Sequence, residues 1–551
     1  MSVQSTAGGT ALAPDAGAAP QVQRLKAGAV GLFGVLFMVT ANAAPITAMT
    51  GNTPISVGYG DGYHAPAAFL VATIVLTIFS VGYVAMAKHI TATGAFYGYI
   101  SHGLGQVAGM ASGFLATMAY IVFEGSLIGI FSSFAKTTVE TVAHGPHISW
   151  IWYALVGIAV IALLGYFDIS ISGKVLGVFL VTEVAVLLVL GFSVLFSGGG
   201  PDGLVPGALN PAGAFTAAPT SADGTVVGVA GLGLFFAFWS WVGFETTAVY
   251  GEESKNPKKI VPQATMIAVI GLGVFYTFIS WMAIAYAGKA GAVDVSRTNA
   301  FGLFYAPTKA NLGTAVLDIY QVLTVTGSFA CALAFHNAAS RYLYAIGREG
   351  LSPALTRTLG STHRRHGSPH ISSAVQSVIT LVIVLLFFWL QKPTKAAPDV
   401  AYTQLYGLLA ILGTMAILIV QSISSFAVIA YFHVRKMHAE TASWWRTFLL
   451  PLVGAAGMIY VVYLLFDNLD FAAGAASGSP VFKATPWIVL GTFVLGVAVA
   501  LGIRYANPDR YAMIGRVVMA ESHERDGEAA AALDVPAQPS GPVSEGAPAG
   551  G

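Results

Sequence analysis

Long apolar segments alternate with short polar ones along almost the whole of this 551-residue chain. A helix needs about 20 apolar residues to cross the hydrocarbon of a membrane. This criterion predicts twelve transmembrane segments, near residues 27–57, 66–88, 95–134, 150–167, 174–197, 227–251, 264–288, 313–339, 371–391, 403–433, 447–467 and 486–505. The first, third and sixth are longer or more interrupted than one span requires. The pattern predicts an all-α polytopic membrane protein.

Composition supports this prediction and excludes several functions. Only 9% of the residues are charged, against about 25% in a soluble domain. The net charge of +1 gives no long-range attraction to nucleic acid. Cys331 is the one cysteine, so no internal disulfide or cysteine-based metal site can form. A phosphate-binding loop with its lysine is absent from the sequence, as is any nucleophile–base pair. We expect no enzyme activity, no cofactor and no metal.

The distribution of Lys and Arg predicts the orientation in the membrane. An N-terminus in the cytoplasm, with alternating loops, places 19 of the 26 Lys and Arg on the cytoplasmic side. Twelve segments return the C-terminus to that side. Residues 1–23 and most of 511–551 are rich in Ala, Gly and Pro and predict disordered cytoplasmic tails. Residues 24–510 form the predicted twelve-helix domain, surrounded by membrane lipid.

Two of the apolar segments are interrupted in corresponding places. The first contains "FMVTANAAPITAMTGNTPIS", residues 37–56, in which Pro45 lacks an N–H group. The sixth contains "FFAFWSWVGFETTAVYGEE", residues 235–253, in which Gly243 precedes a glutamate. Irregular backbone within a membrane is tolerated only beside protein or a water-filled cavity. Either interruption alone is explained by a simple kink, but a pair five helices apart is typical of a secondary transporter's binding site.

Helix breaks of this kind have a simple binding chemistry. Unwinding frees N–H groups at the start of one half-helix, and these suit a carboxylate. It also frees carbonyl groups at the end of the other half-helix, and these suit an ammonium group or a cation. A free amino acid carries both charges. Two facing breaks can therefore hold it without any buried protein charge.

Three motifs resemble one transporter family. "FWSWVGFETTAVYGEESKNPKKIVPQA" resembles the sixth-helix signature of the amino acid–polyamine–organocation superfamily, of the amino acid permease type. "TATGAFYGYISHGLGQVAGMASGF", residues 91–114, is similar to the start of the family's third helix, with Thr93 and Ala95 in place of its usual proline and glycine. "HNAASRYLYAIGREGLSPAL", residues 336–355, is similar to the end of its eighth helix. The resemblance spans about residues 25–510.

The resemblance implies a leucine-transporter-like fold, with two inverted repeats of five helices, two added C-terminal helices, and discontinuous helices 1 and 6. It implies amino acid or amine transport by alternating access, through proton symport or exchange. Matched by position, the candidate substrate-binding residues are Asn42, Ala44, Pro45, Ile46 and Thr47 in the first break and Trp239, Ser240, Trp241 and Gly243 in the second. Pro45, Ile46 and Thr47 replace the family's usual G-S-G.

Three glutamates lie within apolar segments, where ionisable residues are candidates for function. Glu245 matches a family glutamate implicated in coupling and gating, although it could also serve as an acceptor for N–H groups of the broken helix. Glu183 stands where several members have a lysine. It is a candidate proton carrier, with a cation ligand or a structural hydrogen bond as alternatives. Glu124 is a candidate contact for a second substrate amine or a structural group. For His336, a satisfied hydrogen-bonding role is favoured over a proton relay.

The sequence thus predicts a permease of the cytoplasmic membrane that moves an amino acid or amine, coupled to protons. An exchanger of the same fold is the first alternative. A channel or a transport-inactive nutrient sensor is the second. Neither the particular substrate nor the oligomeric state follows from the sequence.

Overall fold

The computed structural model describes residues 28, 30–90, 94–166, 169–251, 253–349, 352–363, 366–394, 399–468, 476 and 478–515. The predicted N-terminal tail, residues 1–23, lies outside this range, as do residues 516–551 of the predicted C-terminal tail. Residues 511–515 of that tail are described. They include the end of a short helix, and the side chain of Ile514 there is buried.

The described chain is helical and contains no named strand. Its first half consists of α1 (Leu32–Ala43), α2 (Pro45–Thr47), η1 (Ala48–Asn52), α3 (Thr53–Ile55), η2 (Ser56–Asp61), α4 (Ala65–Ala87), α5 (Phe96–Leu104), α6 (Gln106–Thr141), α7 (Trp150–Tyr166) and α8 (Ile169–Phe196). The second half consists of α10 (Leu232–Trp239), η5 (Phe244–Thr247), α11 (Pro257–Ala287), α14 (Thr314–Arg348), α16 (His370–Leu390), η6 (Ala401–Tyr406) and α17 (Gly407–Ile429). Two further long helices follow, α18 (Leu450–Asp467) and α20 (Pro480–Ala506).

Short helices connect these segments. They are η3 (Gly62–His64), η4 (Pro206–Leu209), α9 (Gly213–Thr216), α12 (Lys289–Thr298), α13 (Gly302–Leu312), α15 (Pro353–Arg357), η7 (Ala430–Val434), η8 (Ala439–Thr441), η9 (Trp444–Leu449) and α21 (Pro508–Met513). Helix α13 contains an internal proline, Pro307.

The structure confirms the predicted all-α membrane architecture. Eight helical stretches of the described chain are long and apolar enough to cross a membrane, and the first of them covers two predicted segments, from α1 to α4. The remaining predicted segments correspond to α7, α8 and the broken sixth segment. Helices at equivalent positions of the two halves pack together, α4 against α11 and α6 against α14. One detail differs, because residues 95–134 form two helices that meet at Gly105, where φ is 106°.

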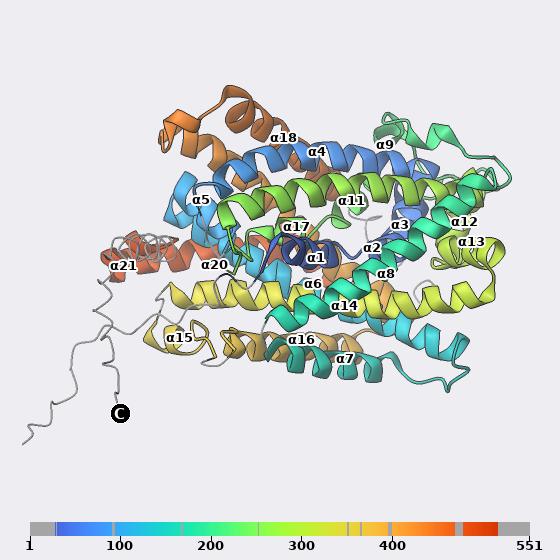
Figure 1. Cartoon of the computed structure of the whole chain (residues 1–551), viewed down its shortest axis with the longest axis horizontal. Helices are drawn as coiled ribbons and strands as arrows, with labels where there is room; N and C mark the ends of the chain where they lie inside the picture. The colour runs from blue at the N-terminus through green and yellow to red at the C-terminus, as the bar shows by residue number, and fades with distance from the viewer. Residues whose placement is uncertain are drawn as a thin grey trace, which may run out of the picture.

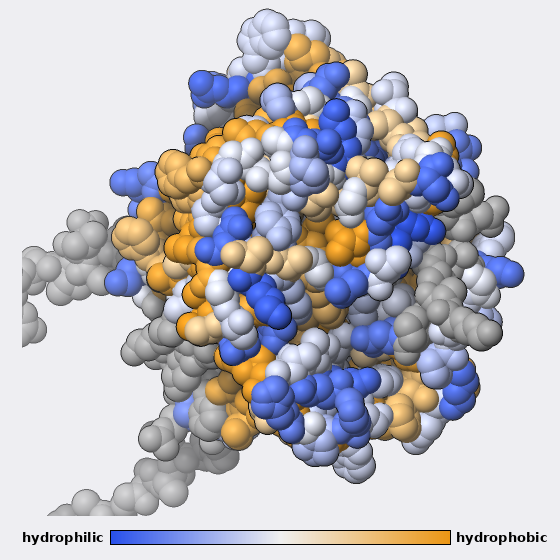
Figure 2. All heavy atoms as spheres, turned by 90° about the vertical axis from the view of Figure 1, so that its right-hand side faces the viewer, coloured by the Kyte–Doolittle hydropathy of each residue, from blue (hydrophilic) through white to orange (hydrophobic). Residues whose placement is uncertain are grey.

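The long helices run roughly side by side, so the bundle has two ends (Figure 1). The end at which the described chain begins and finishes, with α15 and α21, is called the terminal end. The opposite end, with α9, α12 and α13, is called the loop end. Hydrophilic side chains are spread over the loop end, with apolar side chains along part of its rim (Figure 2).

The sides of the bundle are apolar where a membrane would contact them. Exposed large apolar side chains include Trp152 on α7, Val274 on α11, Trp389 on α16 and Trp487 on α20. The interior is apolar as well, with one continuous core that extends through both halves. A bundle that is apolar inside and outside is suited to lipid rather than water.

Close helix packing around α5 depends on small residues, which leads to a first prediction. A Cβ atom at Gly103 would lie 2.7 Å from Ala427 Cα on α17, whereas one at Gly271 on α11 would meet nothing within 4 Å. We expect Gly103→Ala to destabilise the protein by about 1–3 kcal/mol, because overpacking forces the backbones apart. Thermal unfolding in detergent measures this. Gly271→Ala is the control and should not lower the stability, and equal behaviour of the two variants would contradict the packing described.

Candidate functional site

The first helix break is centred on Ala44. Helix α1 ends at Ala43, Ala44 adopts a left-handed conformation with φ of 45°, and the chain resumes as a helix at Pro45. Pro45 cannot donate a backbone hydrogen bond, so the interruption follows from its local chemistry. Two carbonyl groups at the end of α1 find partners outside the helix. Asn42 O accepts from the Cys331 thiol, and Ala43 O accepts from Tyr276 OH at 2.6 Å.

Glu183 of α8 contacts the other side of this break. The backbone N–H of Ile46 lies beside its buried carboxyl group. A Cβ atom at Gly327 of α14 would lie 2.7 Å from Glu183 Cδ, so α14 approaches the carboxyl group closely. Among the described residues, no ion pair includes Glu183. This carboxyl group therefore lies between the first break and α14 without a compensating cation.

The second break follows α10. Residues from Ser240 form successive turns, and the chain resumes at Phe244 as the short helix η5. Gly243 connects the two parts with φ of 111°, a conformation that residues with a Cβ rarely adopt. A Cβ atom there would also lie 2.6 Å from Asn42 Cβ of the first break. The glycine thus allows both the reversal of the chain and the close approach of the two breaks.

Glu245 closes the second break with hydrogen bonds. Its Oε2 accepts from the Gly243 N–H at 3.1 Å, and its Oε1 accepts from Tyr120 OH of α6 at 2.8 Å. The backbone carbonyl of the same residue accepts from Tyr83 OH of α4 at 2.8 Å. The carboxyl group therefore satisfies an N–H group that the break frees, and it ties the break to α6.

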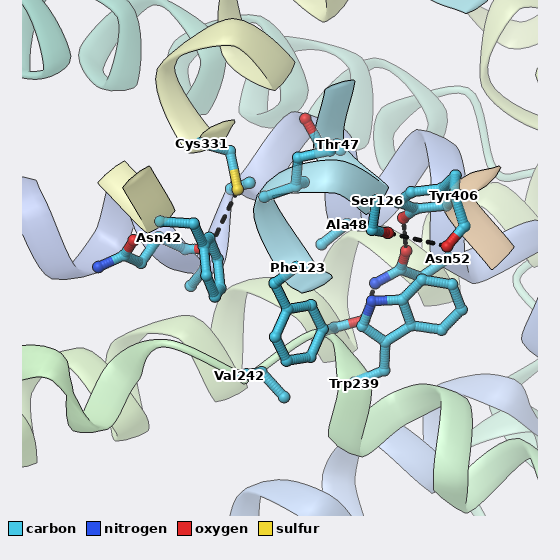
Figure 3. Close-up of a pocket in the computed structure, with 15 residues that line it drawn as sticks. Asn42, Thr47, Ala48, Asn52, Phe123, Ser126, Trp239, Val242, Cys331 and Tyr406 are labelled. Atoms are coloured by element: carbon cyan, nitrogen blue, oxygen red, sulfur yellow. Dashed lines mark hydrogen bonds between the residues drawn. The ribbon is translucent and has the colours of Figure 1, made fainter. Parts of the chain in front are cut away.

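A cavity of about 30 Å³ lies between the two breaks (Figure 3). Its walls come from both breaks, α6, α14 and η6, and they consist of Asn42, Ala43, Ala44, Thr47, Ala48, Asn52, Phe123, Ser126, Leu127, Trp239, Ser240, Val242, Cys331, Phe335 and Tyr406. None of these side chains carries a formal charge. Thr47 Oγ1 is buried and has no hydrogen-bond partner among the described residues. The volume suits a water-sized molecule, so a larger ligand requires the walls to separate.

Aromatic and amide side chains border the cavity toward the loop end. The Trp239 and Tyr406 rings lie 4.9 Å apart between their centroids. Asn52 donates from Nδ2 to Ser240 Oγ at 3.0 Å and accepts from Tyr406 OH. Further out, Tyr402 OH donates to Gly51 O at 2.8 Å. These contacts join the first break to the second and to η6.

Further contacts lie on the side of the cavity toward the terminal end. Asn42 Nδ2 donates to Thr246 Oγ1 at 2.8 Å, which links the two breaks. Further toward the terminal end, Arg341 of α14 forms a buried ion pair with Glu253, at 2.7 Å between Nε and Oε2. The Arg341 guanidinium also lies 5.2 Å from the centre of the Tyr250 ring. These contacts link the second break to the first, and they link the segment after the second break to α14.

The predicted binding residues fall into two groups. Asn42, Ala44, Thr47, Trp239 and Ser240 line the cavity. The other predicted residues do not line it, namely Pro45, Ile46, Glu124, Trp241 and Gly243. The Trp241 ring is directed at α11, where it packs edge-on against Tyr276, and Glu124 bonds to polar groups of α14 and α16.

The sequence analysis did not predict several of the residues that line the cavity. Phe123 and Ser126 lie on α6, Cys331 and Phe335 on α14, and Tyr406 on η6. Apart from the proximity of Phe123 and Ser126 to Glu124, no local signal distinguishes them from ordinary core residues. Whether such a residue lines the cavity depends on which face of its helix points inward, and the structure shows this.

Comparisons with solved structures concern the overall fold. The overall fold is similar to that of a manganese transporter from Eremococcus coleocola, with a TM-score of 0.55 at 10% identity over 84% of this chain and 93% of the other. A nucleobase–cation symport transporter, in a closed conformation with bromovinylhydantoin bound, matches with a TM-score of 0.44 at 12% identity over 84% of this chain and 98% of the other. A search of curated proteins finds no match.

The fold, with its two facing breaks, is of the leucine-transporter type. Residues 30–499 match the amino acid permease family, so the chain belongs to that family. Its place in the amino acid–polyamine–organocation superfamily, which the three sequence motifs indicated, is thereby confirmed.

The geometry of the second break gives a second prediction. Gly243→Ala should strain the backbone by about 1–3 kcal/mol and press a methyl group against Asn42, so the cavity between the breaks should distort. We expect transport to fall by about tenfold or more, since each 1.4 kcal/mol is a tenfold change, with little change in the amount of protein in the membrane. Uptake by cells that express the variant measures this.

Gly224 offers a matched control for backbone strain. It has φ of 84°, lies in the loop before α10, and an added Cβ there would meet nothing within 4 Å. Gly224→Ala should leave uptake within about twofold of the unmodified protein, because loop strain far from the cavity leaves its walls in place. Equal losses in both variants would show that the effect reports strain and not the cavity.

Proposed function

We propose that this permease moves a small amino acid or related amine across the cytoplasmic membrane by alternating access, coupled to protons. The observation that carries the proposal is that two broken helices face each other across one cavity without charged side chains. Such a site offers backbone dipoles to a substrate that brings both charges itself. The terminal end faces the cytoplasm in this proposal, as the excess of Lys and Arg in its loops indicates.

The chemistry of the cavity favours a small zwitterion. An ammonium group finds carbonyl groups at the end of α1 and the faces of aromatic rings, of which Phe123 and Trp239 border the cavity. A carboxylate finds Thr47 Oγ1 and the N–H groups that follow the first break. The contracted volume and the uncharged walls favour a substrate with a short side chain over a long diamine.

The alternative function, an exchanger that moves an amino acid against its decarboxylated product, is supported less well than the proposed symporter. That alternative relies on Glu124 as a partner for a second amine. The Glu124 carboxylate lies outside the cavity wall and is already bonded to His336 at 3.1 Å and to Gln376 at 2.6 Å. A second amine in the cavity would therefore meet no free acidic group of α6.

Glu183 is the residue that we assign to proton coupling. Its carboxyl group lies between the Ile46 N–H of the first break and Gly327 of α14. Ionising a buried carboxyl group without a cation is costly, so the group carries a proton while it stays enclosed. Opening toward either side admits water, which allows the proton to leave. Glu245 has the complementary role of closing the second break around the substrate.

A third prediction tests the assignment of Glu183. Glu183→Gln keeps an acceptor for the Ile46 N–H but removes the titratable group. We expect uptake driven by a proton gradient in proteoliposomes to fall by about tenfold or more, as typical coupling energies imply, while exchange of internal for external substrate continues. Asp318→Asn is the control, because Asp318 lies near the loop end of α14 and does not line the cavity. Gradient-driven uptake that survives in Glu183→Gln would refute the assignment.

A fourth prediction tests the substrate class. Purified protein is heated in the presence of amino acids and diamines, because a ligand that binds the folded state stabilises it by about 2.7 kcal/mol at 100 times its dissociation constant. We expect stabilisation by small zwitterionic amino acids, followed by their gradient-driven uptake into proteoliposomes. Stabilisation by diamines alone, with movement only against internal substrate, would favour the exchanger.

A further inference from the structure

A second group of buried titratable side chains lies directly behind the cavity wall. Glu124 of α6 and His336 of α14 are both fully buried, and His336 Nδ1 lies 3.1 Å from each carboxyl oxygen of Glu124. On the other side of the imidazole, Nε2 lies 2.8 Å from Ser373 Oγ of α16. Neither substrate binding nor the coupling assigned to Glu183 uses this pair.

The side chains of the cluster can form hydrogen bonds with one another both with and without one added proton. Without an added proton, neutral His336 donates from Nδ1 to the Glu124 carboxylate and accepts at Nε2 from the Ser373 hydroxyl. With one proton more, His336 donates from both nitrogens and the hydroxyl becomes an acceptor. Gln376 Nε2 donates to Glu124 Oε2 at 2.6 Å, whereas Gln376 Oε1 is buried without a partner among the described residues. Rotation of that amide would turn the unused oxygen toward a protonated Glu124.

The net charge of the pair depends on that single proton. The protonated pair is neutral overall, whether as carboxylate with imidazolium or as acid with imidazole. The deprotonated pair leaves one uncompensated negative charge in the interior, which is costly. Other charged groups nearby already have partners, because Glu245 bonds to Tyr120 and Arg341 bonds to Glu253.

The cluster lies close to the terminal end. Ser373 is one turn from His370, the first residue of α16, and His370 Nδ1 is buried without a hydrogen-bond partner among the described residues. The His370 ring lies 5.3 Å from that of His363, which bonds to the exposed Tyr166 at 3.0 Å. Groups that can carry a proton therefore follow one another from the surface of the terminal end to Ser373.

Helix α7 seals this cluster from its side. A Cβ atom at Gly165 would lie 2.6 Å from His336 Nε2 and 2.7 Å from Ser373 Oγ, so the α7 backbone covers both groups. The residue after Gly165 is Tyr166, which contacts the histidines at the terminal end. The titratable side chains at this end of α7 and α16 include Tyr166 and His370, whose ring centroids lie 6.2 Å apart.

The cluster is joined to the cavity through adjacent residues. Phe123 precedes Glu124 on α6, and Phe335 precedes His336 on α14. Both phenylalanines line the cavity, and their ring centroids lie 5.1 Å apart. A change in how α6 and α14 are held together at the pair therefore reaches the cavity wall within one residue on each helix.

We propose that Glu124 and His336 form a second protonation site, which exchanges one proton with the terminal side through the start of α16 and controls substrate affinity through Phe123 and Phe335. The proposal builds on the proposed function for its effect on substrate, while the protonation itself does not depend on it. Loss of the proton charges the interior, loosens the contact of α6 with α14, and weakens substrate binding. Affinity therefore falls as the pH at the terminal end rises.

The protonation is tested on purified full-length protein without substrate. Infrared pH-difference spectra report the protonation of buried carboxyl and imidazole groups. We expect a pH-dependent signal that disappears in Glu124→Gln, changes its midpoint in His336→Gln, and shifts in the milder variant Ser373→Ala. Ser377→Ala is the matched control, because Ser377 lies one turn further along α16 and bonds only to the Ser373 backbone. A spectrum of Glu124→Gln identical to that of the unmodified protein would overturn the proposal.

The effect on substrate is tested separately. The dissociation constant of an amino acid that passes the thermal screen is measured against pH in a Glu183→Gln background, which removes the coupling group. We expect it to rise by about fivefold or more between about pH 5 and pH 8 and to become independent of pH when Glu124→Gln is added. A pH-independent constant in the Glu183→Gln background would overturn the control of affinity. If no amino acid binds, the proposed function is wrong. The infrared spectra then test the protonation site by themselves.

Discussion

The structure depends on one constraint, that every backbone N–H and C=O group within a membrane needs a hydrogen-bond partner. Unbroken helices meet this requirement internally. The first and sixth segments do not, and the chain compensates with side chains from neighbouring helices. Tyr276 and Cys331 donate to the carbonyl groups at the end of α1, and Glu245 accepts from the N–H of Gly243. The Glu183 carboxyl group lies beside the N–H of Ile46. The groups that repair the breaks are also the ones that a substrate or a proton can engage.

This arrangement explains why the carboxyl groups and the binding cavity are neighbours without being the same site. A charged side chain inside the cavity would bind one end of an amino acid and repel the other. With the carboxyl groups behind the breaks, the cavity keeps neutral walls and offers dipoles of both signs. Glu183 behind the first break and the Glu124–His336 pair on α6 and α14, behind the cavity wall, can then influence the substrate through backbone and packing rather than by direct contact.

The sequence predicted those parts of the fold and site that have local causes. The number of spans follows from apolar length, and the breaks follow from Pro45 and Gly243, whose conformations are set by their own chemistry. The rotation of unbroken helices has no such local cause. Phe123, Ser126 and Leu127 recur at helical spacing and share the face of α6 that reaches the cavity, whereas Glu124 lies about 100° around the helix from Phe123. The sequence identified Glu124 as unusual but could not show that it contacts α14 and α16.

The central claim is that the two breaks jointly bind the charged groups common to all amino acids. The most direct measurement compares the affinity of the purified protein for one bound amino acid with that for its decarboxylated and its deaminated analogues, which share the side chain. The account predicts that both analogues lose affinity by about tenfold or more, because each removes a charged group that one break receives. An analogue that lacks the carboxylate or the ammonium group and still binds as tightly as the parent amino acid would contradict the account.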